Sequence, residues 1–244
     1  MGSTSNAFKL IQAIVDSGND GATFTSIVGD SGVPKSTAHR LLRELTEIGA
    51  IEHEEGSRTY AGGLLLARLG SAVMSKYDIR NKTYPHLLRL HEQTGHTVTL
   101  GVRDGGQGTY VDKIENRNFG IRLHSEIGKS FPLHCTGIGK VMLAWSSAAE
   151  RQLAMAGKLK AYTRNTITDK KELAQSLKTI RSNGYGIDDE EITRGFVCIA
   201  APVFGPDGNI AGALSCTLPT YVRDERGIDN EIALVVQAAA DASR

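Results

Sequence analysis

The hydrophobic pattern of this 244-residue chain changes its period part-way along. Over roughly the first 60 residues, apolar side chains recur every three or four positions, which is typical of helices. From residue 97 onward, several runs alternate between apolar and polar side chains, which is typical of half-buried strands. The chain is also longer than the roughly 100–200 residues of a usual domain. The sequence therefore predicts two domains, and an α+β fold for the whole.

The N-terminal part predicts the element order of a winged helix-turn-helix: three helices, then a small hairpin. Capping residues, a proline and glycines mark the boundaries of these elements. We expect a helix to about Asp16, a short helix capped by Thr23 or Thr25 and ended by Gly32, a helix with Pro34 in its first turn and Gly49 after its end, and a hairpin with Gly56 at its tip.

The third helix has two different faces. Its apolar face is predicted to consist of Ala38, Leu41, Leu42, Leu45 and Ile48. The opposite face carries hydroxyls and arginines, which suit phosphates and base edges, and its first turn offers backbone N–H groups to an anion. The alternative is an ordinary solvated helix face, and a net charge of +1 favours neither interpretation. The predicted DNA-binding residues are Lys35, Ser36, Thr37, His39, Arg40, Arg43 and, in the hairpin, Arg58.

Residues 64–77 form a long amphipathic stretch, which we interpret as a linker helix that can also pair with its copy in a dimer. The remainder predicts a mixed, mainly antiparallel sheet with flanking helices. The expected helices are 84–93, 136–145, 170–181 and 231–242, and the expected strands are 97–103, 109–115, 121–125, 197–204 and 209–218.

The start of the helix near Thr136 is a candidate anion site. Thr136, Gly137, Ile138 and Gly139 present backbone N–H groups with little side-chain bulk, and a carboxylate fits there without a basic residue. The alternative is a threonine N-cap followed by glycines that allow close packing.

The hairpin over 197–218 predicts a second part of the same pocket. With its turn between Asp207 and Gly208, Cys198 lies opposite Thr217 and Ala200 opposite Ser215. Strand periodicity then places Ser215 and Thr217 on one face and Cys216 on the other. This face is suited to a ligand, or it is a half-buried surface whose hydroxyls bond to backbone.

Asp188 is a candidate acceptor for a ligand hydroxyl or for backbone N–H groups near this pocket. Its acidic neighbours Asp189, Glu190 and Glu191 are interpreted as surface charge.

Motifs of other protein classes are missing from the sequence. There is no Gly-x-Ser-x-Gly or His-Glu-x-x-His, and the P-loop pattern fails around Gly139-Lys140. The three cysteines, Cys135, Cys198 and Cys216, are too few for a disulfide framework and lack zinc-ligand spacing. No apolar stretch reaches the roughly 18 residues of a membrane span. We therefore expect a cytoplasmic protein that is not an enzyme, with no cofactor, metal or membrane partner. The alternatives are a zinc ion held by His134, Cys135, Cys198 and Cys216, and a catalytic Cys/His pair.

Several motifs, in order along nearly the whole chain, resemble the IclR family of bacterial transcription regulators. They are VPKSTAHRLL at 33–42, FPLHCTGIGK at 131–140, RSNGYG at 181–186, DDEE at 188–191 and CIAAPV at 198–203. The resemblance implies a winged helix-turn-helix, a linker helix and a GAF-like effector-binding domain. It also implies homodimers or homotetramers that bind palindromic double-stranded operators.

The resemblance further implies an effector pocket built from Gly137, Ile138, Asp188, Cys198, Ser215 and Thr217. The wall candidates are Leu123, Phe131, Leu133, Met142 and Phe196. We predict a DNA-binding domain at 1–62, a linker helix at 63–78 and an effector-binding domain at 79–244. The function expected is regulation of a catabolic pathway in response to a small organic acid. The alternative is an enzyme or binding protein that uses the C-terminal pocket alone.

Overall fold

The computed structural model describes residues 2–18, 21–74, 78–116 and 125–244. The chain divides into two compact units, Met1–Lys76 and Tyr77–Arg244.

The first unit combines helices with a small antiparallel sheet. Its helices are α1 (Ser3–Asp16), α2 (Phe24–Ser31), α3 (Lys35–Glu47) and α4 (Leu64–Met74), and its strands are β1 (Ala22–Thr23), β2 (Ile51–Glu54) and β3 (Thr59–Gly62). The strand order is β1-β3-β2. The predicted order of helices and hairpin is confirmed, while β1 was not predicted: its two residues pair with Thr59 and Tyr60.

Local signals fix most of these boundaries. The Thr23 hydroxyl accepts the Ser26 N–H at 3.3 Å, and Gly32 ends α2 with φ +64°. Pro34 occupies the N-cap position of α3 and not its first turn. The prediction for Ile48 was wrong: it is 63% exposed, because it is the C-cap residue and follows the last turn that packs on the core.

The second unit is built on one six-stranded sheet with helices on both faces. Its strands are β4 (Thr97–Asp104), β5 (Gln107–Ile114), β6 (Ser130–Phe131), β7 (Gly186–Asp189), β8 (Phe196–Phe204) and β9 (Ile210–Pro219). Its helices are α5 (Asp78–Thr94), α6 (Gly137–Trp145), α7 (Ala148–Ala154), α8 (Lys170–Asn183), α9 (Thr220–Arg226) and α10 (Asp229–Ala242). The order is β6-β5-β4-β9-β8-β7, and neighbouring strands among the described residues are antiparallel.

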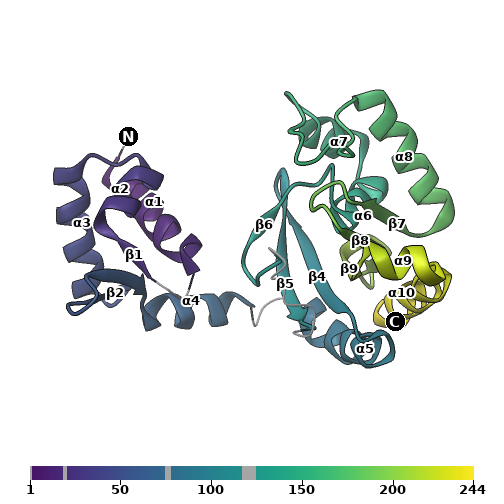
Figure 1. The fold of residues 1–244 in the computed structure, drawn as a ribbon, viewed down its shortest axis with the longest axis horizontal. Coiled ribbons are helices and arrows are strands. Elements are labelled where there is room, and N and C mark those ends of the chain that lie inside the picture. The colour runs from purple at the N-terminus through teal and green to yellow at the C-terminus, as the bar shows by residue number, and fades with distance from the viewer. Residues whose placement is uncertain (1, 19–20, 75–77, 117–124) are drawn as a thin grey trace. The chain divides into compact units, whose positions relative to one another are not determined.

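The side-chain alternation of β8 and β9 separates the two faces of this sheet. Cys216 points to the α5 side, where its Sγ lies 3.9 Å from Thr94 Oγ1. Cys198 and Ala200 point to the opposite side, where α6 packs with Gly137 against them. The α5 and α10 helices cover the first face, and α6 and α8 lie on the second (Figure 1). The candidate pocket residues therefore share the α6 face.

Two expectations for this unit need correction. The helix predicted from residue 84 begins at Asp78, six residues earlier, and carries Pro85 inside it. A proline usually marks a helix start, but here packing of α5 on α10 and the sheet outweighs the one lost hydrogen bond. The strand expected at 121–125 lies outside the described residues, except for Ser125, which is not in a strand.

Candidate functional site

The exposed face of α3 carries the predicted DNA-binding side chains. Lys35, Ser36, His39, Arg40 and Arg43 are exposed, while Thr37 is half-buried. Each arginine has an acidic neighbour one turn later. Arg40 Nη1 lies 2.6 Å from a Glu44 oxygen, and Arg43 Nε lies 3.7 Å from one of Glu47. Such exposed pairs are weak, so both guanidinium groups remain available to a stronger anion.

A hollow lies between α3 and the β2–β3 hairpin. Of the predicted residues, Ser36, His39, Arg40 and Arg43 line it. Thr46, His53 and Tyr60 line it as well. The His39 ring is fixed by stacking on Phe24, with ring centroids 4.0 Å apart. Arg58 lies away from this hollow, exposed in the turn of the hairpin with φ +54°.

The start of α3 is suited to an anion. No side chain caps this helix, because Pro34 at the N-cap has no group that accepts a hydrogen bond. The first-turn N–H groups, which have no partner inside a helix, belong to Lys35, Ser36 and Thr37. A phosphate oxygen would find donors and the positive end of the helix dipole there.

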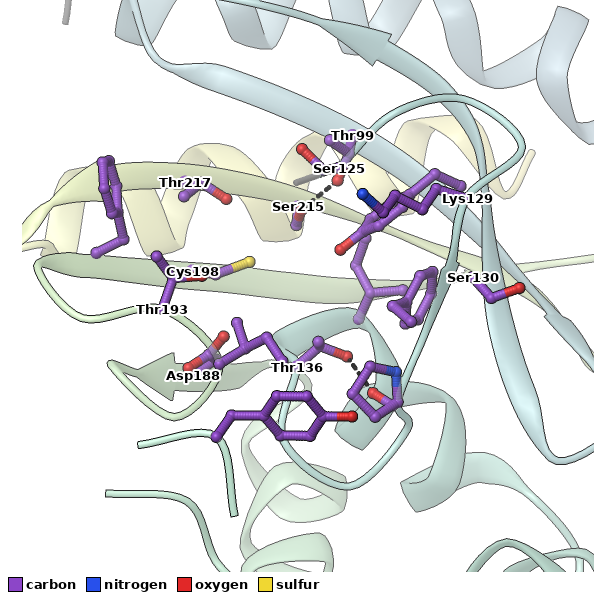
Figure 2. Close-up of a pocket in the computed structure, with 17 residues that line it drawn as sticks. Thr99, Ser125, Lys129, Ser130, Thr136, Asp188, Thr193, Cys198, Ser215 and Thr217 are labelled. Carbon is purple, nitrogen blue, oxygen red and sulfur yellow. Dashed lines mark hydrogen bonds between the residues drawn. The ribbon is translucent and has the colours of Figure 1, made fainter. Parts of the chain in front are cut away.

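A second cavity, of about 370 Å³, lies in the other unit on the α6 face of the sheet (Figure 2). It has an apolar lining with many hydroxyls. The lining residues are Thr99, Tyr110, Ser125, Lys129, Ser130, Phe131, Pro132, Thr136, Ile138, Tyr162, Asp188, Ile192, Thr193, Phe196, Cys198, Ser215 and Thr217. Five of the six residues predicted for an effector site are among them.

The predicted register of the β8–β9 hairpin is confirmed: Cys198 pairs with Thr217 and Ala200 with Ser215. Three of these side chains line the cavity, while Ala200 lies in the core beneath. Burial raises the pKa of Cys198 to about 11, although hydrogen bonds from Thr217 and Ser215 oppose the shift. Cys198 is therefore a neutral thiol near pH 7, and a neutral thiol is a poor nucleophile.

Asp188 lies beside Cys198 on the neighbouring strand β7 and is 3% exposed. Its Oδ1 accepts the Glu191 N–H at 2.7 Å. Burial raises the pKa of Asp188 to about 7, because the charged carboxylate loses solvation that two backbone hydrogen bonds do not fully replace. This carboxyl group can therefore bind a ligand as either an acceptor or a donor.

The start of α6 differs from the predicted anion site. The Gly139 N–H donates to Thr136 Oγ1 at 3.1 Å, so one of the expected free donors is already used. Gly137 does not line the cavity. A Cβ on Gly137 would lie 3.0 Å from the Cys198 carbonyl oxygen, so this glycine allows α6 to approach β8. Thr136 and Ile138 do line the cavity.

The walls include residues that the sequence did not single out. Phe131 and Phe196 are wall residues as expected, Leu133 and Met142 are not, and Leu123 lies outside the described residues. The residues missed are Thr99, Tyr110, Ser125, Lys129, Ser130, Pro132, Tyr162, Ile192 and Thr193. Strand alternation gave a usable signal for Thr99 and Tyr110. The others lie outside long regular elements, where no periodicity marks a face.

The interpretation of Glu191 as surface charge was wrong. Glu191 is 5% exposed, and its carboxylate pairs with the buried Lys140 ammonium. Asp189 is exposed and pairs with Arg223, whereas the Glu190 carboxylate accepts the Gly195 N–H at 2.7 Å. Only contacts made in the folded protein distinguish the buried Glu191 from its neighbours Asp189 and Glu190.

Cys198 and Cys216 lie on opposite faces of the sheet, as predicted. Within the described ranges, no three His, Cys, Asp or Glu side chains are grouped so that they could hold a metal ion. In the same ranges, no helix is both long and apolar enough to cross a membrane.

Comparison with known proteins assigns both units. Residues 71–244 match the family described as bacterial transcriptional regulator IclR C-terminal, and residues 3–55 match the IclR helix-turn-helix domain. The chain belongs to the IclR family of bacterial transcriptional regulators. The α3 surface lies within the helix-turn-helix match, and the 370 Å³ cavity lies within the C-terminal match.

Individual members of the IclR family are similar to this chain over nearly its whole length. The HTH-type transcriptional regulator XynR of Escherichia coli is 34% identical over 235 residues, which cover 95% of this chain and 93% of XynR. An IclR transcriptional regulator from Alicyclobacillus acidocaldarius has a TM-score of 0.84 at 27% identity and covers 99% and 97% of the two chains. An IclR homolog from Microbacterium hydrocarbonoxydans, solved with 4-hydroxybenzoate, shares the fold, with a TM-score of 0.83 at 19% identity and coverage of 99% and 98%.

Proposed function

We propose that this IclR-family chain is a ligand-responsive transcription regulator of a catabolic pathway in the cytoplasm. In this proposal the first unit binds a palindromic double-stranded operator as part of a homodimer or homotetramer. The second unit binds a small organic acid. The observation that carries the proposal is the presence, in one chain of this family, of a basic uncapped helix start and a separate hydroxyl-lined cavity. We assign no catalytic role to either site.

The DNA contact is assigned to the exposed face of α3 and the hairpin tip. We propose that Ser36, Arg40 and Arg43 enter the major groove from α3, in the manner of a recognition helix. The N–H groups of the first turn bind a phosphate. The residues that we propose to contact DNA are Lys35, Ser36, Thr37, His39, Arg40, Arg43 and Arg58.

The effector contact is assigned to the cavity on the α6 face, with Ile138, Asp188, Cys198, Ser215 and Thr217 touching the ligand. Gly137 supports the site by letting α6 approach β8. A ligand changes DNA binding only if it binds the two assembly geometries with different affinity. We keep the division into 1–62, a linker helix at 63–78 and 79–244 as part of this proposal, because the linker would transmit that difference.

The proposal is tested with the double variant Arg40→Ala/Arg43→Ala in the full chain. Binding to DNA from upstream of the protein's own gene is measured by fluorescence anisotropy. We expect the variant to lose operator binding but to keep the ligand-induced rise in melting temperature found in a screen of carboxylic acids. Arg89→Ala, an exposed arginine of α5, is the matched control.

Two results would overturn the proposal. Unchanged operator binding by the double variant would remove α3 from the DNA contact. Equal ligand-induced thermal shifts in the wild type, Asp188→Ala and Ser215→Ala would place the ligand outside the cavity.

A further inference from the structure

Two charged side chains, Lys129 and Asp188, are found among the described residues that line the cavity. Figure 2 shows them at opposite sides of it, with Asp188 beside Cys198 and Lys129 on the side of Ser125 and Ser215. The cavity therefore has a positive end and an acidic end.

The backbone around Lys129 is fixed by hydrogen bonds to β5 and within its own turn. The Gly128 N–H donates to the Tyr110 carbonyl at 2.7 Å, the Tyr110 N–H donates to the Lys129 carbonyl at 3.1 Å, and the Lys129 N–H donates to the Glu126 carbonyl at 3.0 Å. These bonds hold the Lys129 backbone at the cavity wall, so that its side chain lines the cavity.

The Lys129 ammonium forms no ion pair with any described residue, although acidic groups pair with most of the other buried or half-buried cations of this unit. Figure 2 shows its nitrogen directed toward the side of the cavity that holds Ser125 and Ser215. A half-buried cation without a counter-ion at a cavity wall favours an anionic group of a ligand.

Ser125 supplies an independent observation at the same end. Its residue is 9% exposed, and its Oγ is buried without a hydrogen-bond partner among the described residues. Native structures rarely leave a buried hydroxyl unpaired, because the lost hydration is not replaced. An oxygen of a bound carboxylate would accept the hydrogen of this hydroxyl and remove that cost.

The opposite end is unsuited to a carboxylate. Asp188 already accepts the Glu191 N–H, and a second carboxylate beside it would meet a like charge unless Asp188 keeps its proton. A ligand hydroxyl is suited to this end, because it donates to Asp188 without adding charge. The cavity is also lined by the apolar or aromatic side chains of Tyr110, Phe131, Ile138 and Phe196.

We propose that the cavity selects a hydroxy-carboxylic acid, with its carboxylate bound by Lys129 and Ser125 and its hydroxyl donating to Asp188. This inference rests on the proposed function, because it names the chemical class of that same effector. It places the acid group away from the α6 start, where Thr136 already occupies the Gly139 N–H. Lys129 and Ser125 are then the residues that select for the acid group.

The test uses isothermal titration calorimetry on the full chain with two series of probes. One series is 4-hydroxybenzoate, benzoate and 4-hydroxybenzamide, and the other is 4-hydroxybutanoate, butanoate and 4-hydroxybutanamide. We expect a hydroxy acid of at least one series to bind about tenfold more tightly than its deoxy and amide analogues, because each analogue loses one charge-assisted hydrogen bond.

Substitutions at the two ends of the cavity test which group of the ligand each end binds. Lys129→Met should weaken the hydroxy acid but not its amide, so that the preference for the acid over the amide disappears. Ser125→Ala should weaken the acid more than the amide, because the amide oxygen accepts only an uncharged hydrogen bond from Ser125. Asp188→Asn should reduce the preference for the hydroxy acid over its deoxy analogue, with the preference over the amide retained. Lys178→Met, an exposed lysine of α8, is the matched control and should change nothing.

Three outcomes would overturn the inference: no binding by either hydroxy acid, equal binding by the deoxy analogues, or an unchanged acid-over-amide preference in Lys129→Met. Circular dichroism and the melting temperature of the variant exclude misfolding as the cause of a lost preference. The proposed function fails in a different way, through the absence of operator binding or of its modulation by any carboxylic acid. If other acids release the operator while Lys129→Met behaves as wild type, the regulator proposal stands and this inference does not.

Discussion

Lys140 and Glu191 form an ion pair in the interior of the second unit, with side chains 3% and 7% exposed. The Lys140 ammonium also donates to the Ile187 carbonyl at 2.6 Å. The Glu191 N–H in turn donates to Asp188. The pair therefore ties α6 to the strand β7 that carries Asp188 into the cavity.

Removal of one member of this pair should destabilise the second unit strongly. We expect Lys140→Met to lower the free energy of unfolding by about 3–5 kcal/mol, because Glu191 would keep a buried charge without its counter-ion. Urea unfolding at neutral pH measures the change. The double variant Lys140→Met/Glu191→Leu should recover much of the loss, and a single-variant loss below about 1 kcal/mol would show that the pair is not desolvated in solution.

Asp188 should make stability depend on pH between its ordinary pKa and about 7. Its pKa is raised in the folded protein by burial, so the folded state retains a proton that the unfolded state has lost. The free energy of unfolding therefore falls as pH rises through this range, by at most about 1.4 kcal/mol per pH unit.

The variant Asp188→Asn isolates this contribution, because the amide oxygen can still accept the Glu191 N–H but does not titrate. The stability of the variant relative to wild type should rise from about pH 4 to pH 7 and level off above that value. Urea unfolding across this range provides the measurement. A difference that stays constant with pH would show that Asp188 titrates normally.

Gly108 should be needed for the position of the Phe131 ring at the cavity wall. A Cβ on Gly108 would overlap the Phe131 ring, and the ring also lies against Gly101, where a Cβ would meet it at 2.8 Å. We expect Gly108→Ala to cost about 1–3 kcal/mol in urea unfolding and to weaken ligand binding, because the ring must move. Gly106→Ala is the control, since no atom lies within 4 Å of the added methyl. Equal stability of the two variants would contradict this account.

Arg43, which we place in the major groove, should also contribute its charge to DNA binding. Its guanidinium is exposed and only loosely paired with Glu47. If it contacts one phosphate, Arg43→Ala should reduce the slope of log affinity against log salt by about 0.9, because one fewer counter-ion is released. Anisotropy titrations at several salt concentrations measure the slope, with Arg89→Ala as the control. A salt-dependence slope in Arg43→Ala equal to that of the wild type would show that Arg43 contacts no phosphate.

The sequence by itself determined the elements whose signals are local. Thr23 and Gly32 delimit α2, and Thr136 caps α6. The register that places Cys198 opposite Thr217 follows from the turn after Pro206 together with a shift of pairing between Val203 and Phe204, which the sequence did not predict. The capping predictions succeeded because helix capping depends on residues a few positions apart. The predicted hairpin located Cys198, Ser215 and Thr217, which line the cavity.

Tertiary structure alone decided which polar residues are buried and what they meet. Glu191 follows three other acidic residues and carries no signal of its own, yet it is buried because Lys140, 51 positions earlier, reaches it. Ser125 and Lys129 lie in an irregular segment and join the cavity only because that segment is bonded to β5. Sequence patterns report periodicity within one element, whereas the desolvation and pairing of a charge depend on elements brought together by the folded chain.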